Sequence, residues 1–291
     1  MTMAPEIIAD PARLRRRLAE MRKPGETIGL APTMGALHAG HAKLLETARR
    51  ENPLVVASIF VNPLQFDRKD DLDAYPRRMR EDLQMCAEQG VSVVFAPGSA
   101  DLYPEEQLTF VESPALSRYL CGEFRPGHFR GVATVVLKLF NIVQPDFAYF
   151  GEKDAQQLAI IRRMVKDLNV PVSVVPVATV REPDGLALSS RNKRLTPAER
   201  AIAPVLSRAL RESLRQIDEG ERSVARVREE ATRLLARHPE VRVEYFSVTD
   251  PETLSPVQQI EGPVLIAGAI WLGSVRLIDN VAWPKKGARE I

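Results

Sequence analysis

Two of the chain's four histidines lie three residues apart in the segment 32–41, PTMGALHAGH. An apolar run that predicts a strand precedes this segment, and a helical pattern follows it. The N-terminus of a helix presents unpaired N–H groups and a partial positive charge, and Gly35 and Gly40 let the backbone approach an anion closely. Imidazoles at the first turn can donate N–H bonds to phosphate oxygens, and the helix dipole favours their neutral form. His38 and His41 therefore predict a phosphate site at the start of a helix.

Other chemistries match the same segment less well. Residues 35–42 approach the P-loop pattern G-x4-G-K-[ST], but His41 replaces the lysine and Ala42 replaces the hydroxyl that binds magnesium. The sequence contains no G-x-G-x-x-G, which disfavours a dinucleotide dehydrogenase. A zinc site needs further ligands, and His128 and His238 are the other two histidines. A purely structural role, in which both imidazoles cap the helix, stays open beside the preferred phosphate site.

Two further segments carry groups that suit a nucleotide. In FGEKD, residues 150–154, Lys153 can meet a phosphate as a point charge, and Asp154 can cap a helix or accept from a ribose hydroxyl. In DGLALSSRN, residues 184–192, two hydroxyls stand beside Arg191, which can bind a phosphate bidentately, and a glycine can act as a hinge. Taken alone, a turn with a capping aspartate explains the first segment at least as well, and a polar linker explains the second equally well.

Three more segments combine polar and apolar side chains. Asn62–Phe66 and the pair Gln156–Gln157 place neutral amides beside apolar residues, which suits a small ligand with hydroxyl groups and an apolar body. Arg125–Gly131 adds a basic loop. By themselves, these segments predict only a polar pocket.

The composition is that of an ordinary globular protein. The 291 residues favour two domains, and 45% hydrophobic against 27% charged residues allow a sizeable core. A net charge of +2 is too small to predict general attraction to nucleic acid or to an anionic membrane. The most apolar stretches, 54–61 and 264–271, are shorter than the roughly 20 residues of a membrane span. The amino terminus lacks the pattern of a signal peptide. We therefore expect a cytoplasmic protein in which Cys86 and Cys121 are free structural thiols.

Strand and helix patterns alternate through the first part of the chain. Asp10 and Pro11 predict the start of a helix that ends before Pro24. This alternation predicts an α/β fold, a Rossmann-like doubly wound parallel sheet in which ligands bind beyond the carboxyl ends of the strands. The predicted strands are 27–31, 54–61, 91–96, 147–150 and 172–177, and the predicted helices between them are 41–51, 76–89, 131–143 and 154–168.

The pattern changes near residue 179. A capping box at Thr196–Glu199 predicts a long charged helix to about Glu219. A helix at 223–237 and strands at 241–249, 264–270 and 275–278 follow, with a turn at Gly273. We therefore predict a first domain at 1–178 and a smaller C-terminal α+β domain at 179–291.

Six ordered segments closely resemble the pantothenate synthetase (pantoate–β-alanine ligase) family: PTMGALHAGH, SIFVNPLQF, RPGHFRGV, FGEKDAQQL, DGLALSSRN and GAIWLG. The resemblance spans nearly the whole chain, and six motifs in order are far more specific than any one of them. This family belongs to the nucleotidyltransferases with an H-x-G-H motif and a KMSKS-like loop, for which 188–191 stands here. The lysines of that loop are absent, so Arg191 must supply its cationic charge, and Leu188 replaces a methionine common in the family.

The resemblance implies an ATP-dependent, AMP-forming ligase. Pantoate carboxylate attacks the α-phosphorus of ATP to give pantoyl adenylate and pyrophosphate, and the amine of β-alanine then attacks the acyl carbon and releases AMP. The implied catalytic residues are His41, as proton donor, His38, Lys153 and Arg191. Gln65 and Gln157 are implied to bind pantoate, with Gln65 also bordering β-alanine. The implied ATP site consists of Met34, Gly35, Ala36, Leu37, His38, Ala39, Gly40, His41, Gly151, Glu152, Lys153, Asp154, Val180, Leu188, Ser189, Ser190 and Arg191.

The resemblance also implies Mg²⁺ on the triphosphate, with Asp82 as a candidate ligand, a homodimer formed through the first domain, and a second domain that acts as a lid. One alternative is another adenylyl transferase of the same fold that acts on a different acceptor. A second is an RNA-binding protein that uses the arginine-rich helices at 200–237. Acidic residues alternate with those arginines, which favours a solvated helical face, so we expect neither a nucleic-acid nor a membrane partner.

Overall fold

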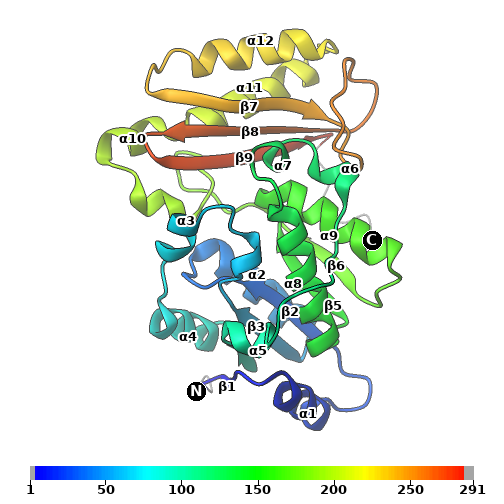
Figure 1. Ribbon diagram of the computed structural model, residues 1–291. Helices are drawn as coiled ribbons and strands as arrows, with labels where there is room; N and C mark the ends of the chain where they lie inside the picture. The colour runs from blue at the N-terminus through cyan, green and yellow to red at the C-terminus, as the bar shows by residue number, and fades with distance from the viewer. Residues whose placement is uncertain (1–3, 285–291) are drawn as a thin grey trace. The chain divides into compact units, whose positions relative to one another are not determined.

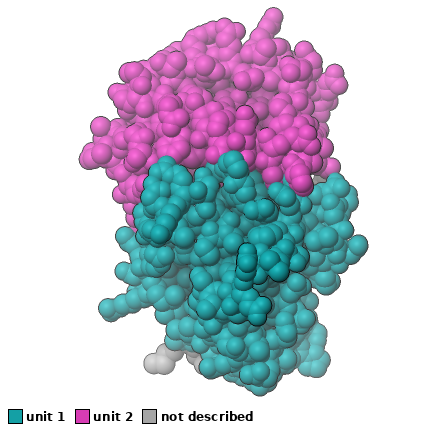
Figure 2. Space-filling view, in the orientation of Figure 1, with its two compact units in different colours: residues 1–113, 125–152, 160–178 teal, residues 114–124, 153–159, 179–291 magenta. Residues whose placement is uncertain are grey.

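The computed structural model describes residues 4–284 of the chain. The chain divides into two compact units, which Figure 2 colours separately. The main division falls between Ala178 and Thr179, and two earlier segments, 114–124 and 153–159, group with the later residues. Unit 1 consists of Met1–Ser113, Arg125–Glu152 and Ile160–Ala178, and unit 2 consists of Pro114–Phe124, Lys153–Ala159 and Thr179–Ile291.

Unit 1 is built on a six-stranded parallel sheet. Its strands are β1 (Glu6–Ile8), β2 (Ile28–Thr33), β3 (Leu54–Ile59), β4 (Val93–Phe95), β5 (Phe147–Gly151) and β6 (Ser173–Val177). They lie in the order β1-β4-β3-β2-β5-β6, and every neighbouring pair is parallel. The chain proceeds from β2 to β3 and β4 on one side, and then to β5 and β6 on the other. The order therefore reverses between β2 and β5, which is where doubly wound sheets bind ligands.

Helices cover this sheet because its central strands are mostly apolar and bury side chains on both faces. All six residues of β3 are buried, as expected of a parallel strand covered on both faces. Leu45 and Ala48 of α2 (Ala39–Glu51) belong to the same core as Val55 of β3. The other helical segments are α1 (Pro11–Met21), η1 (Pro63–Gln65), α3 (Lys69–Asp73), α4 (Met79–Glu88), α5 (Ser99–Leu102), α8 (His128–Val143), η2 (Glu152–Asp154) and α9 (Ala155–Asp167).

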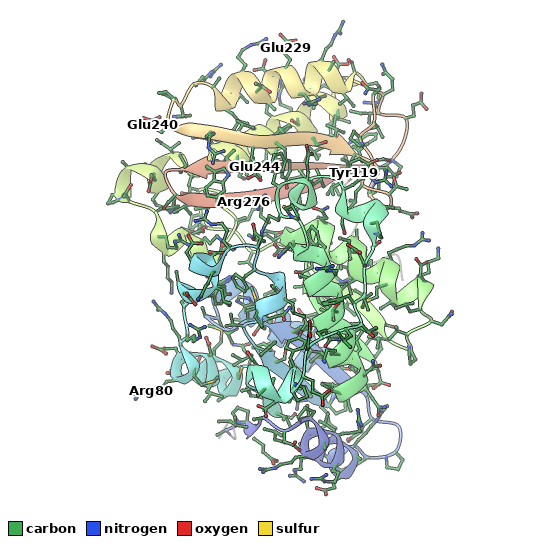
Figure 3. The ribbon with its side chains drawn as sticks, viewed as in Figure 1. Arg80, Tyr119, Glu229, Glu240, Glu244 and Arg276 are labelled. Atoms are coloured by element: carbon green, nitrogen blue, oxygen red, sulfur yellow. The ribbon has the colours of Figure 1, made fainter. Side chains whose placement is uncertain are left out.

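Unit 2 contains a three-stranded antiparallel sheet in the order β7-β8-β9. Its elements are α6 (Pro114–Ser117), α7 (Cys121–Phe124), η3 (Ser190–Arg194), α10 (Pro197–Ile202), α11 (Val205–Asp218), α12 (Val224–Leu235), β7 (Val241–Thr249), β8 (Val264–Leu272) and β9 (Val275–Trp283). Figure 1 shows α11 and α12 lying along this sheet, and their apolar side chains share one core with it. Glu244 of β7 pairs with Arg276 of β9 (Figure 3) and accepts from Trp271 Nε1 at 2.8 Å.

The predicted fold class is confirmed, and the differences have local causes. The predicted helix from Thr196 to about Glu219 is wrong in its continuity, because Pro204 lacks a backbone N–H and separates α10 from α11. Its capping box does form, with Glu199 N–H donating to Thr196 Oγ1 at 3.3 Å. β1 was not predicted, since three residues are too few to show a period. β8 and β9 run further than predicted, to Leu272 and Trp283.

The charged and sulfur-containing side chains mostly behave as expected. Arginines of the helices after residue 200 form ion pairs with neighbouring acids, including Arg215 with Glu219 and Arg233 with Glu229. Both cysteines are buried and free. Burial, together with the nearby charge of Asp82, raises the pKa of the Cys86 thiol to about 12, which makes it unreactive. Among residues 4–284, every helix is too short or too polar to span a bilayer.

A buried ion pair joins Arg181, near the start of the last stretch of unit 2, to β9, and it predicts an effect on stability. Asp279 is 4% exposed and accepts from Arg181 at 2.6 and 2.9 Å. Asp279→Ala leaves a half-buried guanidinium without its partner, and we expect it to lower the free energy of unfolding by about 2 to 4 kcal/mol. Urea unfolding followed by the fluorescence of Trp271 and Trp283, the two tryptophans, measures this in unit 2.

The matched control is Glu229→Ala on α12, which removes one partner of an exposed pair (Figure 3). That change is expected to cost less than about 0.5 kcal/mol. Equal losses in the two variants would contradict an anchoring role for Asp279.

Candidate functional site

The predicted phosphate-binding segment forms a tight turn between β2 and α2. Gly35 and Ala36 both adopt left-handed backbone conformations, with φ of 79° and 51°. A Cβ on Gly35 would lie 2.9 Å from Asp82 Oδ2, so the position has room only for glycine. The turn ends at Ala39, where α2 begins. The segment therefore connects the strand beside the reversal of the sheet to a helix N-terminus, as the sequence predicted.

A carboxylate from another helix holds this turn. Asp82 of α4 is 2% exposed, and its two oxygens accept from the backbone N–H groups of Ala36 at 2.9 Å and Leu37 at 2.7 Å. The left-handed conformation of Ala36 is costly for a residue with a side chain, and these two bonds offset that cost. Asp82 is thus a positioning residue for the turn, a role that the sequence analysis missed.

The two imidazoles cap the helix that follows. His38 is the N-cap residue, and its Nδ1 accepts from Gly40 N–H at 3.1 Å. His41 Nδ1 accepts from His38 N–H at 3.3 Å, and the two ring centroids are 4.1 Å apart. A neutral imidazole that accepts at Nδ1 carries its proton on Nε2. Helix capping by the two imidazoles is therefore compatible with phosphate binding. Capping at Nδ1 fixes the tautomer in which Nε2 is the donor.

Gly40 also leaves space for the ring of His38. A Cβ on this residue would lie 2.9 Å from His38 Cε1 and 3.0 Å from His38 Nδ1. The His38 ring therefore lies against the backbone of Gly40, and only glycine leaves room for it there. This packing explains the glycine of H-x-G-H, and the reciprocal capping bonds explain the spacing of the two histidines.

Gln65 lies beside the same turn, buried and held through its side chain. Its Nε2 donates to Met34 Sδ at 2.9 Å, and its Oε1 accepts from Asn62 Nδ2 at 3.1 Å. Asn62 is fixed in turn by Tyr103, whose hydroxyl donates to Asn62 Oδ1 at 2.9 Å. The structure thus brings Gln65 next to the first residue of the predicted ATP segment, and it adds Asn62 and Tyr103 as residues that orient the amide.

The segment after β5 is divided between the two units. Gly151 ends β5, which pairs with β2, and Glu152 follows it in unit 1. Lys153 and Asp154 belong to unit 2, where Lys153 Nζ lies 3.8 Å from Asp154 Oδ1. The carbonyl of Lys153 accepts from Asn280 Nδ2 at 2.8 Å. Lys153 is therefore fixed through its backbone to β9.

The neighbouring amides Gln156 and Gln157 differ in their surroundings. Gln156 is buried, and its Nε2 donates to the carbonyls of Leu116 and Tyr119 at 2.9 and 2.7 Å. Gln157 is only half-buried. Gln156 is thus occupied with holding the segment 114–124, and Gln157 remains the predicted ligand of the pair.

The serine and arginine loop is anchored within unit 2. Leu188 N–H donates to the carbonyl of Val180 at 3.0 Å, and Ser189 Oγ caps η3 by accepting from Arg191 N–H at 3.2 Å. Asn192 Nδ2 donates to the carbonyl of Ala187 at 3.1 Å. Backbone and side-chain hydrogen bonds therefore connect the segments that carry the five residues predicted here, namely Val180, Leu188, Ser189, Ser190 and Arg191. The hydroxyl hydrogen of Ser189 can still be donated.

The predicted site residues are thus found in two groups. Unit 1 holds Met34, Gly35, Ala36, Leu37, His38, Ala39, Gly40, His41, Gln65, Gly151 and Glu152, and unit 2 holds Lys153, Asp154, Gln157, Val180, Leu188, Ser189, Ser190 and Arg191. Within unit 1, the turn, both imidazoles and Gln65 are joined by the contacts above. No group of three or more His, Cys, Asp or Glu suited to a metal ion occurs among the described residues.

Comparison with known proteins identifies the family of the chain. The sequence model of the family described as Pantoate-beta-alanine ligase matches residues 6–282. The pantothenate synthetase of Moorella thermoacetica is 50% identical, over 95% of this chain and 98% of its own length, and that of Sinorhizobium medicae is 53% identical, over 96% of both.

Solved structures agree as well. The crystal structure of pantothenate synthetase from Thermus thermophilus superposes with a TM-score of 0.89 at 47% identity, over 95% of this chain and 98% of that one. The pantoate-beta-alanine ligase of Francisella tularensis, complexed with beta-gamma ATP and beta-alanine, reaches a TM-score of 0.78 at 35% identity, over 96% and 97%. With its glycine-flanked imidazole pair at the reversal of the sheet, this chain belongs to the pantoate–β-alanine ligase family.

Proposed function

We propose that the protein is an ATP-dependent ligase that joins (R)-pantoate to β-alanine through a pantoyl adenylate. The observation that carries this proposal is the turn at 34–41, where two neutral imidazoles with Nε2–H donors start a helix beside the reversal of the sheet. The family membership selects this reaction over adenylyl transfer to another acceptor. The Francisella tularensis relative complexed with beta-gamma ATP and beta-alanine supports the choice of two of the three substrates.

In the first proposed step, a pantoate carboxylate oxygen forms a bond to the α-phosphorus of ATP. The bond between that phosphorus and the bridging oxygen breaks, and the electron pair leaves with pyrophosphate. Negative charge moves onto the phosphate oxygens, so fixed N–H donors lower the barrier without a covalent nucleophile. His38 and His41 supply such donors, with His41 as the proton donor, and Gln65 and Gln157 orient pantoate.

In the second proposed step, the uncharged amine of β-alanine attacks the acyl carbon of the adenylate. The bond from the acyl carbon to the phosphate oxygen breaks, AMP leaves, and the new amide nitrogen loses a proton to solvent. Lys153 and Arg191 are proposed to neutralise the phosphates. The remaining contacts to ATP are proposed to come from the backbone at 34–41 and 151–154, Val180 and 188–191.

Mg²⁺ is proposed to bind ATP chiefly through the triphosphate, where it would neutralise phosphate charge. Mg²⁺ in such sites takes one or two carboxylates and fills its remaining positions with phosphates and water. Asp82 does not fit as its ligand, because it is buried beneath the turn and both of its oxygens face backbone N–H groups.

Three further properties are proposed from the family resemblance alone. Unit 2 is proposed to act as a lid during the reaction, unit 1 to form a homodimer, and the protein to work in the cytoplasm. Light scattering of the purified chain tests the second of these, since a monomer at micromolar concentration would contradict it.

The decisive test of the activity is exchange of labelled pyrophosphate into ATP. Exchange is expected to require pantoate and to proceed without β-alanine, because the adenylate forms first. Pantothenate and AMP should then appear in equal amounts when β-alanine is added. Folded protein that exchanges pyrophosphate only with a different acid supports the alternative adenylyl transferase instead.

His41→Ala removes a fixed donor from the phosphates. We expect it to lower the rate of pantoate-dependent exchange by about 10² or more, as loss of a charge-stabilising donor does. His238→Ala, in unit 2 just after the end of α12, serves as the control and should retain the wild-type rate. If His41→Ala exchanges as fast as this control, His41 has no part in the chemistry.

Asp82→Asn tests the support beneath the turn. An amide offers one oxygen and one NH₂ group, so one of the two backbone N–H groups meets a donor instead of an acceptor. We expect exchange to slow about tenfold or more, with a loss of about 1 to 3 kcal/mol in unfolding free energy. Glu88→Gln, a change at the last residue of the same helix, is the control. A normal rate in Asp82→Asn would show that the turn keeps its shape without the carboxylate.

A further inference from the structure

A second set of hydrogen bonds reaches Gln65 through its backbone. The carbonyl of Gln65 accepts from His128 Nδ1 at 2.7 Å and from Arg125 Nη2 at 3.3 Å. Arg125 Nη1 lies 3.2 Å from His128 Nε2, and Arg125 Nη2 lies 3.3 Å from Asp67 Oδ1. All four residues belong to unit 1. Both ends of Gln65, side chain and backbone, are therefore held by separate partners.

These contacts determine the tautomer of His128. A carbonyl oxygen can only accept, so Nδ1 must carry a proton, and a guanidinium can only donate, so Nε2 must accept. His128 is thus a neutral imidazole protonated on Nδ1. His38 and His41 have the opposite tautomer, since both accept at Nδ1. The difference comes from Arg125, whose guanidinium faces Nε2 of His128 and requires that nitrogen to accept.

The surroundings make this arrangement rigid. The side chain of Arg125 is 17% exposed and that of Asp67 is 27% exposed, so the pair is largely shielded from water. The His128 ring packs edge-on against Phe129, with centroids 4.8 Å apart. A Cβ on Gly131 would lie 2.2 Å from the Leu64 carbonyl oxygen, so the first turn of α8 lies directly against η1. The start of α8 is therefore fixed to the backbone that presents Gln65.

Resting on the proposed function, we infer that His128 is a positioning residue for pantoate. It holds the backbone of Gln65 so that the side-chain amide keeps its orientation between Met34 and Asn62. Arg125, oriented by Asp67, keeps His128 in the tautomer that this bond requires. His128 acts through Gln65, so its loss should weaken pantoate binding and leave ATP binding unchanged.

The kinetic test uses pantoate-dependent pyrophosphate exchange by the full chain. His128→Ala removes the donor, and we expect the KM for pantoate to rise about tenfold, as loss of one hydrogen bond can cause. The KM for ATP and the urea midpoint should stay close to wild type. His128→Asn, whose amide N–H can take the place of Nδ1–H, should bring the pantoate KM back to within about threefold of wild type.

The spectroscopic test needs no activity. Long-range ¹⁵N–¹H spectra of the ¹⁵N-labelled wild-type protein at pH 7.5 report which ring nitrogen of each histidine carries the proton. The signal that disappears in His128→Asn is expected to be a neutral Nδ1–H ring. An Nε2–H or doubly protonated ring at His128 would overturn the inference.

The outcomes separate the two proposals. Wild-type protein that exchanges no pyrophosphate overturns the proposed function, and with it the pantoate role of His128. An active wild type whose pantoate KM is unchanged in His128→Ala overturns the inference alone. A lower urea midpoint with equal losses of ATP and pantoate affinity in both variants also overturns it, because it assigns His128 to folding.

Discussion

A buried carboxylate beneath the turn at 35–37 is the constraint on which the predicted phosphate site depends. Ala36 occupies a left-handed conformation that costs on the order of 1 to 3 kcal/mol, and such a conformation persists only when its surroundings determine it. Asp82 does so by accepting from two consecutive N–H groups. Because these two N–H groups are paired within the protein, the chain can turn sharply after β2. The N-terminus of α2 then lies beyond the carboxyl end of that strand.

The choice of histidine at this helix start follows from the shape of the imidazole ring. Serine, aspartate or asparagine caps a helix through an oxygen that lies close to the backbone. An imidazole accepts at Nδ1 and, on the opposite side of the ring, carries a donor at Nε2. His38 and His41 can therefore satisfy the helix and still offer N–H groups to an anion. His128 shows the reverse assignment, because a carbonyl faces its Nδ1 and a guanidinium faces its Nε2.

Features that depend on neighbouring residues were predictable from the sequence, and features that depend on distant pairs were not. The H-x-G-H segment at a helix start, the alternation of strands and helices, and the capping box at Thr196 all follow from short-range patterns. Asp82 lies 46 residues beyond Ala36 on a helix that also carries exposed acids, so its sequence surroundings do not mark it as buried. The family resemblance suggested Asp82 as a metal ligand, whereas its carboxylate accepts from the backbone N–H groups of Ala36 and Leu37. The grouping of 114–124 with unit 2 had no sequence signal either.

The loop at 188–191 illustrates how anchoring affects recognition. Its sequence, with serines and a glycine upstream, is equally typical of a polar linker. The bonds of Arg181 to Asp279, of Arg200 to Asp184 and of Asn192 to Ala187 instead fix the backbone on both sides of it. Ordering a flexible loop costs free energy each time a ligand binds, and a loop that is already shaped avoids most of that cost. The backbone N–H of Arg191, the proposed phosphate ligand, donates to Ser189 Oγ at 3.2 Å, so the backbone that carries this side chain is already shaped before a ligand binds.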